Sequence, residues 1–339
     1  MRKPFAYGLS IPVAIALLLG ALAGGLGYFV IPLIAFAIVP VADIFIGTSR
    51  WPSEFALKKI TRAQERGYDA ALVAASFVTL SVLGFGLWWV TGHDLAGWEF
   101  AGLAISVGIF SGYVGIVAAH ELIHRENAFH RALGWVLMSA ALYPHFCVEH
   151  VMGHHPRFAT PEDHATARRG ESLYLFVPRS IFRGLFSALQ FRPGPVLAAY
   201  ALLVLALFVI YHWLGQQALW LMLIQALVAV VLLEGINYLE HYGLLRKRRP
   251  DGGYEQPGPG HSWDTSSLIT NLNIFNLGRH SDHHSFSRRP YYRLRHNDAA
   301  PQLPFGYTTM VLVALVPPLW FRIMNRRLDA WRAGQTAPA

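Results

Sequence analysis

The chain is poor in cysteine and in charge. Cys147 is the one cysteine in 339 residues, which excludes a disulfide framework and any Cys-rich iron–sulfur or zinc-ribbon module within the chain. Only 14% of the residues are charged, against roughly 25% in an average soluble domain. Hydrophobic residues make up 54%, and the mean hydropathy is +0.35. This balance predicts a polytopic membrane protein rather than the two soluble domains that the length alone would suggest.

Six stretches are apolar over the roughly 20 residues that a transmembrane helix needs. Gly24, Gly25 and Gly27 offer a tight turn between the first two stretches, and Gly215 offers one between the last two. The stretch from Tyr307 to Phe321 is short and contains two prolines, so we expect it to lie at the interface or against the bundle. The sequence therefore predicts an all-α fold in which residues 1–339 form a single membrane-embedded domain, with spans at about 8–24, 28–47, 70–91, 99–119, 196–213 and 217–237.

Lysine and arginine are missing from one side of this predicted bundle. The loop at 91–98 has neither, whereas the N-terminus and the segments after the second, fourth and sixth spans are basic. Because cytoplasmic loops carry the excess of positive charge, we expect both termini in the cytoplasm and a multi-pass protein of the inner (plasma) membrane. A net charge of +8 then favours an anionic membrane surface as partner and not nucleic acid. The basic residues used here include Arg2, Lys3, Arg50, Lys58, Lys59, Arg62 and Arg66.

Histidine, in contrast, is abundant. Of 16 histidines, only His93 and His212 fall at the outer ends of predicted spans, where they are expected to be interfacial; the other fourteen fall on the inner side. Nine of them lie in four clusters: His120 and His124; His150, His154 and His155; His241; and His280, His283 and His284.

The spacing within the clusters is that of metal ligands on a helix. Residues i and i+4 are neighbours on a helical face, so we expect His120 with His124, His150 with His154, and His280 with His283 or His284 to converge. One metal normally takes four to six ligands, so nine imidazoles predict two metals. Imidazole suits iron, copper, zinc and nickel alike, and the ligand type alone does not name the ion.

Each cluster also carries an acid next to a histidine. Adjacent helical residues point about 100° apart, so we expect these acids to accept the free N–H of a histidine from another cluster and so to orient its ring. The four candidates are Glu121, Glu149, Glu240 and Asp282. The remaining inner histidines lack a partner at ligand spacing and are expected around the site or at the surface: His130, His145, His164, His261 and His296.

Taken together, the four clusters resemble those of the integral-membrane non-haem diiron alkane monooxygenase family, which includes xylene-type monooxygenases and is more distantly similar to membrane fatty acyl desaturases. The likeness covers roughly residues 8–325 and departs slightly at Arg125 and in the Leu-Gly-Arg that precedes His280. The matching strings are HELIHR at 120–125, EHVMGHH at 149–155, NYLEHYGL at 237–244 and LGRHSDHH at 277–284, with TPEDHATARRGES at 160–172.

The resemblance implies two irons shared by the nine clustered histidines in a cytoplasmic cap, with O₂ as co-substrate. It also implies hydroxylation of the terminal carbon of an alkane or similar apolar chain. Electrons would come from a separate rubredoxin or ferredoxin and its NAD(P)H reductase, because the chain has no cysteines for such a module. That donor would dock on the basic inner face, where the candidates are Arg246, Lys247, Arg248, Arg249, Arg288 and Arg289.

Three other functions share parts of this pattern. A desaturase begins with the same hydrogen abstraction but removes a second hydrogen instead of adding oxygen. An intramembrane zinc protease would use HExxH at 120–124 with Glu121 as general base, but it leaves seven clustered histidines unused. A His-rich metal transporter or buffer is expected to bind its ion near the bilayer midplane, whereas the predicted clusters lie at one membrane face.

Overall fold

The computed structural model describes residues 4–51 and 60–336, and this part of the chain is helical without β-strands. Arg2, Lys3, Lys58 and Lys59, on which the predicted orientation partly rests, lie outside the described residues. After η1 (Pro4–Tyr7), the first apolar helices are α1 (Ser10–Ala23) and a continuous helical run formed by η2 (Gly25–Phe29), α2 (Val30–Leu33), η3 (Ile34–Ile38) and α3 (Val39–Ile46).

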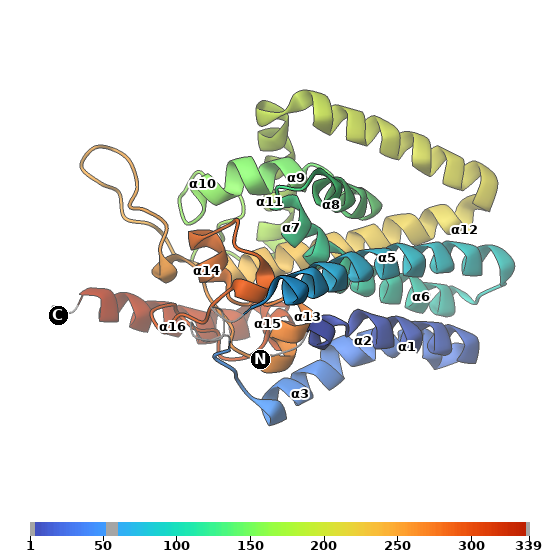
Figure 1. The fold of residues 1–339 in the computed structure, drawn as a ribbon, viewed down its shortest axis with the longest axis horizontal. Coiled ribbons are helices and arrows are strands. Elements are labelled where there is room, and N and C mark those ends of the chain that lie inside the picture. Colours follow the sequence, from blue (N-terminus) through green and yellow to red (C-terminus); the bar gives the residue numbers. More distant parts are fainter. Residues whose placement is uncertain (1–3, 52–59, 337–339) are drawn as a thin grey trace.

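Longer helices form the centre of the molecule. They are α5 (Arg62–Gly92), the continuous run of α6 (Gly97–Phe110), η4 (Ser111–Ile116) and α7 (Val117–Ile123), and α12 (Pro193–His241). Thr61 starts α5 with a capping box, since its hydroxyl accepts from the backbone N–H of Gln64 and the Gln64 side chain accepts from the backbone of Thr61. α12 is 49 residues long and breaks at Gly215, whose φ of 84° is outside the helical region. Figure 1 shows the chain turning back at this break, as the glycine predicts.

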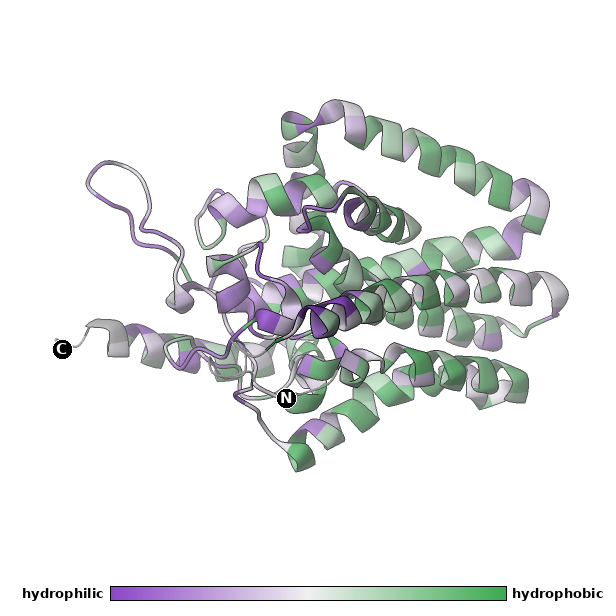
Figure 2. Ribbon diagram, in the orientation of Figure 1, coloured by the Kyte–Doolittle hydropathy of each residue, from purple (hydrophilic) through white to green (hydrophobic). Residues whose placement is uncertain are grey.

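Within residues 4–51 and 60–336, four helices are long and apolar enough to cross a membrane: Gly25–Ile46, Arg62–Gly92, Gly97–Ile123 and Pro193–His241. α1 is apolar too but has only 14 residues. Helices therefore occupy all six predicted stretches, while the number of crossings stays a prediction. Hydrophobic residues cover these helices, and polar residues gather at the end of the molecule where the remaining elements lie (Figure 2).

The elements at the polar end are short and come from two parts of the sequence. Between α7 and α12 lie α8 (Ala128–Ala140), α9 (Phe146–Val148), η5 (Glu149–His154), α10 (His155–Arg157) and α11 (Leu173–Phe191). After α12 come η6 (Pro259–His261), α13 (Leu268–Asn273), α14 (His280–Ser285), η7 (Tyr291–Arg293), α15 (Tyr307–Ala314) and α16 (Pro317–Thr336). The predicted packing of the stretch 307–321 is confirmed, because α15 contacts α12 and buries Tyr307, Met310 and Ala314.

Two glycines bring α6 and its continuation η4 into backbone contact with α12. A Cβ added to Gly108 would lie 2.7 Å from Cβ of Val228 and 2.9 Å from the carbonyl oxygen of Gln225. One added to Gly112 would lie 3.1 Å from Cα of Ala229. Small residues four apart allow this kind of close approach between membrane helices. The contact matters for the site, because His120 and His241 lie at the ends of these two packed helices.

We predict that Gly108→Ala lowers the free energy of unfolding by about 1–3 kcal/mol, the usual cost of overpacking. Equilibrium unfolding in detergent micelles measures this change. Gly84→Ala on α5 is the matched control, because an added Cβ there meets no atom within 4 Å. Equal stability of the two variants would contradict the close-contact interpretation.

Candidate metal centre

The structure brings together all nine clustered histidines, and it sorts them into two adjacent groups. Within each group, one ring nitrogen from each histidine lies within 4.8 Å of those of the other members. We call them the five-histidine group (His120, His124, His150, His155 and His283) and the four-histidine group (His154, His241, His280 and His284).

In the four-histidine group the Nε2 atoms face one another. His284 Nε2 lies 2.9 Å from His280 Nε2 and 3.2 Å from His154 Nε2. His280 Nε2 is also 3.2 Å from His241 Nε2. The four rings come from η5, α12 and α14, so three separate segments supply one small cluster of nitrogens.

The five-histidine group has the same arrangement. His120 Nε2 lies 2.9 Å from His283 Nε2, and His150 Nε2 lies 3.0 Å from His155 Nε2. The Nε2 atom of His124 is buried and has no hydrogen-bond partner among the residues that the structure describes. The groups adjoin, since the ring centroids of His155 and His284 are 4.5 Å apart.

Burial lowers the pKa of six of these rings and so favours their neutral form. Desolvation lowers the pKa of His124 to about 3. It also takes the pKa values of five further members well below the usual value, with neighbouring histidines adding to the effect: His150, His155, His280, His283 and His284. A neutral imidazole is the form that binds a metal.

The donor set fits transition-metal ions. Imidazole nitrogens bind such a metal at about 2.0–2.1 Å, so two ligands at right angles have nitrogens about 3 Å apart, close to the spacings seen here. Two facing Nε2 atoms can share one proton in a single N–H···N hydrogen bond. A third or fourth nitrogen in the same group is then left without a donor. A bound cation satisfies all the lone pairs together, including that of His124.

The second cluster pairs differently from the i, i+4 prediction. Residues Glu149–His154 form a π-helical turn, η5, in which each turn takes one more residue than in an α-helix. His150 therefore pairs with His155, five residues on, while His154 joins the other group. The predicted pair of His150 and His154 is wrong for this reason. In α14 the α-helical spacing does hold, and His280 pairs with His284 while His283 faces His120.

Three of the four predicted acids hold arginines, and the prediction that they orient histidines is wrong for them. Glu121 Oε1 lies 2.8 Å from Arg125 and accepts the backbone N–H of Tyr291. Glu149 pairs with Arg157 at 3.0 Å, and Asp282 pairs with Arg289, seven residues on. Each acid fixes the position of its own cluster through a basic residue nearby in sequence. The contacts of Glu121 also leave the zinc-protease alternative without support, since it needs this carboxylate as a free base.

The fourth acid, Glu240, does contact a clustered histidine. Its Oε2 lies 3.1 Å from His280 Nε2, and its Oε1 accepts from the Tyr307 hydroxyl at 2.6 Å. It approaches the nitrogen that faces the group and not the outer Nδ1, so it lies on the metal side of the ring.

Two further acids that the pattern did not identify support the histidines. Asp163 Oδ2 lies 3.0 Å from His154 Nδ1 and accepts from the Thr166 hydroxyl at 2.6 Å. Burial alone would raise its pKa, but the charge and hydrogen bond of His154 lower the pKa of Asp163 to about 2. Asp264 accepts from both the backbone N–H and the hydroxyl of Ser281, in the first turn of α14. Asp163 lies in the quoted tract at 160–172, which was the available signal; Asp264 had none.

The other seven histidines stay outside both groups. Directly after α5 the His93 ring stacks on Trp89 with ring centroids 3.8 Å apart, and on α12 the His212 ring stacks on Phe208 at 6.0 Å. The remaining ones lie around the site or towards the surface, as expected: His130, His145, His164, His261 and His296.

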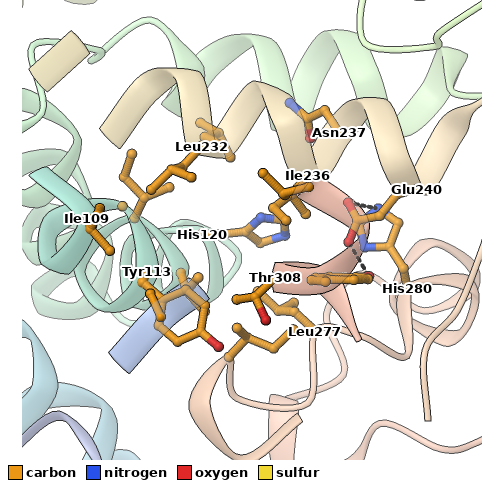
Figure 3. A pocket seen from close by; sticks show the side chains of 18 of the residues that line it. Ile109, Tyr113, His120, Leu232, Ile236, Asn237, Glu240, Leu277, His280 and Thr308 are labelled. Atoms are coloured by element: carbon orange, nitrogen blue, oxygen red, sulfur yellow. Dashed lines mark hydrogen bonds and ion pairs between the residues drawn. The ribbon is translucent and has the colours of Figure 1, made fainter. Parts of the chain in front are cut away.

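An apolar cavity ends at both histidine groups (Figure 3). His120 of one group and His280 of the other line it, together with Glu240. About 750 Å³ of space lies between its atoms, including the open end. The rest of its wall is mainly hydrophobic and comes from η3, α6, η4, α12 and α15: Phe36, Ile109, Leu232, Leu233, Ile236 and Val311 are examples. The arrangement places an apolar space against the candidate metal centre.

Comparison with known proteins agrees with this geometry. The sequence model of the family described as "Fatty acid desaturase" matches residues 96–314. Alkane 1-monooxygenase 1 of Pseudomonas aeruginosa is 43% identical over 289 residues, which cover 80% of this chain and 75% of that protein. Alkane 1-monooxygenase 2 of the same organism is 37% identical over 324 residues, 89% of this chain and 84% of that protein.

A more distant relative is the xylene/toluene monooxygenase hydroxylase component of Pseudomonas putida, 28% identical over 256 residues, 71% of this chain and 68% of that protein. The nine clustered histidines, the apolar cavity at their side and these similarities over most of the chain lead to one assignment: the chain belongs to the alkane 1-monooxygenase family, within the wider fatty acid desaturase family.

Proposed function

We propose that this chain is a membrane monooxygenase that uses O₂ to hydroxylate the terminal carbon of an alkane or a similar apolar chain. The observation that carries the proposal is the apolar cavity that ends at both histidine groups. The names of the relatives, alkane 1-monooxygenases and a xylene/toluene monooxygenase, support the reaction class.

The proposed cofactor is a pair of irons, one in each histidine group, with the nine clustered histidines as ligands. When bound, iron supplies the redox chemistry that O₂ activation requires and that zinc lacks. The protein favours the neutral form of six ligand rings by burying them, and it fixes His154 through Asp163. Glu240 lies beside His280 at the inner end of the cavity, where it would border both substrate and metal.

The chain's own residues would position the substrate by shape. The cavity wall offers an apolar chain mainly van der Waals contact, and its inner end presents one carbon to His120 and His280. Hydrocarbon enters such a site from the bilayer, so we propose one membrane-embedded domain with six spans. The basic segments favour an inner-membrane protein with both termini and the site in the cytoplasm.

The first prediction concerns the reaction. The iron-loaded protein, supplied with reductant and a panel of n-alkanes under ¹⁸O₂, should give primary alcohols that carry one labelled oxygen. Mass spectrometry of the products measures this. Alkenes without label would instead indicate the desaturase alternative, and no product from any chain length would overturn the proposal.

The second prediction concerns the residue that orients His154. Asp163→Asn should weaken iron binding by about 10–100-fold, the usual effect of losing a carboxylate that orients a ligand histidine. A competitive chelator titration measures the affinity. Glu162→Gln is the matched control, because the neighbouring Glu162 is exposed and contacts Tyr254 and not a histidine. If both variants bind iron like the parent, Asp163 does not support the metal.

Electrons require a separate redox partner, and we propose a soluble rubredoxin or ferredoxin with its NAD(P)H reductase. Two of the six candidate docking residues are held inside the protein, and two others, Arg249 and Arg288, form exposed surface pairs with Asp251 and Glu126. Arg246 is only 9% exposed and donates to the carbonyl of Pro156, and Arg289 is paired with Asp282. Lys247, Arg248, Arg249 and Arg288 remain exposed.

The best-placed of these is Arg288, since it follows α14, which carries three of the histidines. Its side chain is 84% exposed, and the neighbouring Phe286 is 51% exposed. We propose that an acidic partner docks on this face, within a few residues of His283 and His284.

The third prediction tests this face. Arg288→Glu should raise the KM for the soluble donor about fivefold at low salt, with kcat for a saturating donor unchanged, because charge complementarity acts mainly on encounter. Steady-state kinetics at increasing ionic strength measures it, and the difference should shrink as salt rises. Arg192→Glu, an exposed arginine at the start of α12, is the control. A KM that is indifferent both to the substitution and to salt contradicts electrostatic docking.

A further inference from the structure

A second cavity touches both histidine groups and differs in character from the first. His150 of the five-histidine group and His154 of the four-histidine group line it. The two cavities share only Asn237 among their lining residues, and the second one is the smaller, with about 330 Å³ between its atoms when the open end is included. We call it the polar cavity because of the side chains that line it, chiefly Tyr143, His145, Glu149, His164 and Glu234.

One carboxyl group in this cavity has no arginine or lysine partner among the bonds of the described residues. Glu234 on α12 is 2% exposed, and its Oε1 accepts from the Tyr143 hydroxyl at 2.8 Å. Its Oε2 accepts from the Asn237 amide at 3.3 Å. Burying an acid among neutral groups lowers the stability of the fold, and such acids are frequent at functional sites. Glu234 lies in none of the four histidine clusters, so the sequence pattern gives no signal for it.

The cavity also offers a place for water. His145 Nδ1 bonds to the Tyr200 hydroxyl at 2.6 Å, while its buried Nε2 has no partner among the described residues. A Cβ added to Gly184 would lie 3.9 Å from this Nε2 and 3.7 Å from Cγ of Glu149. Space beside a buried, unpaired ring nitrogen is the setting in which proteins hold ordered water. His164 and Ala165, both partly exposed, form the outer part of the lining.

The proposed reaction needs protons as well as electrons. Each turnover converts R–H, O₂, two electrons and two protons into R–OH and H₂O. One oxygen atom enters the C–H bond, and the other takes both protons and leaves as water. The separate redox partner supplies the electrons. The apolar cavity, once filled by hydrocarbon, has no water chain to carry protons inward.

We infer that the polar cavity delivers solvent protons to the oxygen-reducing site, with Glu234 and water beside Gly184 as carriers. Solvent enters past His164, and Glu234 passes a proton towards the space beside His150 and His154 and regains one from the water behind it. Glu149 is not needed in this route, because Arg157 holds it. The inference rests on the proposed function and adds residues that act on the proton and not on the substrate.

Two variants test the carriers. Glu234→Gln keeps the size of the side chain but removes the exchangeable carboxyl proton, and it should lower alcohol formation at least about tenfold, in the range of general-acid effects. Peroxide released per O₂ consumed should rise, because two-electron-reduced oxygen that receives no proton within the site would leave it and take its protons from bulk solvent as hydrogen peroxide. Glu234→Asp should recover most of the coupling. Gly184→Ala fills the space for water without touching a titratable group and should lower coupling about threefold or more.

A readout that does not depend on turnover is ordered water. A high-resolution structure of the parent should show water within hydrogen-bond distance of His145 Nε2, and the Gly184→Ala variant should lack it. The control is Gln225→Met, which removes a buried polar group of the same helix outside both cavities and should leave coupling unchanged. Iron content and alkane binding are measured for every variant.

The outcomes separate the two proposals. A parent protein that forms no alcohol overturns the proposed function. An active parent whose Glu234→Gln and Gly184→Ala variants stay coupled within twofold overturns the proton route. Loss of activity in Glu234→Gln that follows loss of iron, with no recovery in Glu234→Asp, also overturns it and makes Glu234 a structural residue.

Discussion

The constraint on which the structure depends is the burial of nine imidazole rings in one small volume. Each buried polar nitrogen without a partner costs about 1–3 kcal/mol, and in both groups nitrogens face nitrogens, with little to share but one proton per pair. Such an arrangement is stable only if something accepts the lone pairs together. The surrounding scaffold is consistent with this demand: arginines hold the acids of three clusters, Asp264 fixes the start of α14, and Gly108 packs the helix of His120 against that of His241.

The membership of the candidate metal centre was predictable from the sequence because four separate histidine clusters indicated it. Four clusters at one end of predicted spans had to meet if the spans packed, and all nine histidines did meet. Their assignment to groups was not predictable, since the pairing of His150 with His155 depends on a π-turn that a 3.6-residue period does not reveal. The partners of Glu121, Glu149 and Asp282 depended on where arginines fold, which spacing from a histidine does not encode.

For the helices, too, the sequence predicts local features but not the contacts between packed helices. Apolar runs located each long helix, and Gly215 marked the break in α12 because only its backbone conformation permits the turn. The glycines at 108 and 112 were visible in the sequence, but their close contact with α12 is a property of the packed pair. In the sequence Glu234 is only an acid within an apolar stretch, and its contacts with Tyr143 and Asn237 become visible only in the folded structure.

The proposed chemistry has two requirements, and each is met by a different cavity: the apolar cavity for the substrate and the polar cavity for the protons. Hydrocarbon needs a surface that offers it no polar competitor, whereas proton transfer needs groups that bind water. The helix α12 borders both spaces, with Leu232 and Ile236 on the apolar side, Glu234 on the polar side and Asn237 shared. One helix thus separates the two environments by the ordinary angular spacing of its side chains.

Because residues 149–154 form a π-turn, the positions of His150, His154 and His155 depend more on the number of residues in this segment than on their identity. Val151 and Met152 are 37% and 40% exposed, so their side chains tolerate exchange. Deleting one of them would shorten the turn to α-helical spacing, rotate His155 by about 100° and move His150 out of step with its partner. An insertion would do the same in the opposite sense. In homologous proteins we therefore expect substitutions at these two positions but no insertion or deletion within the segment.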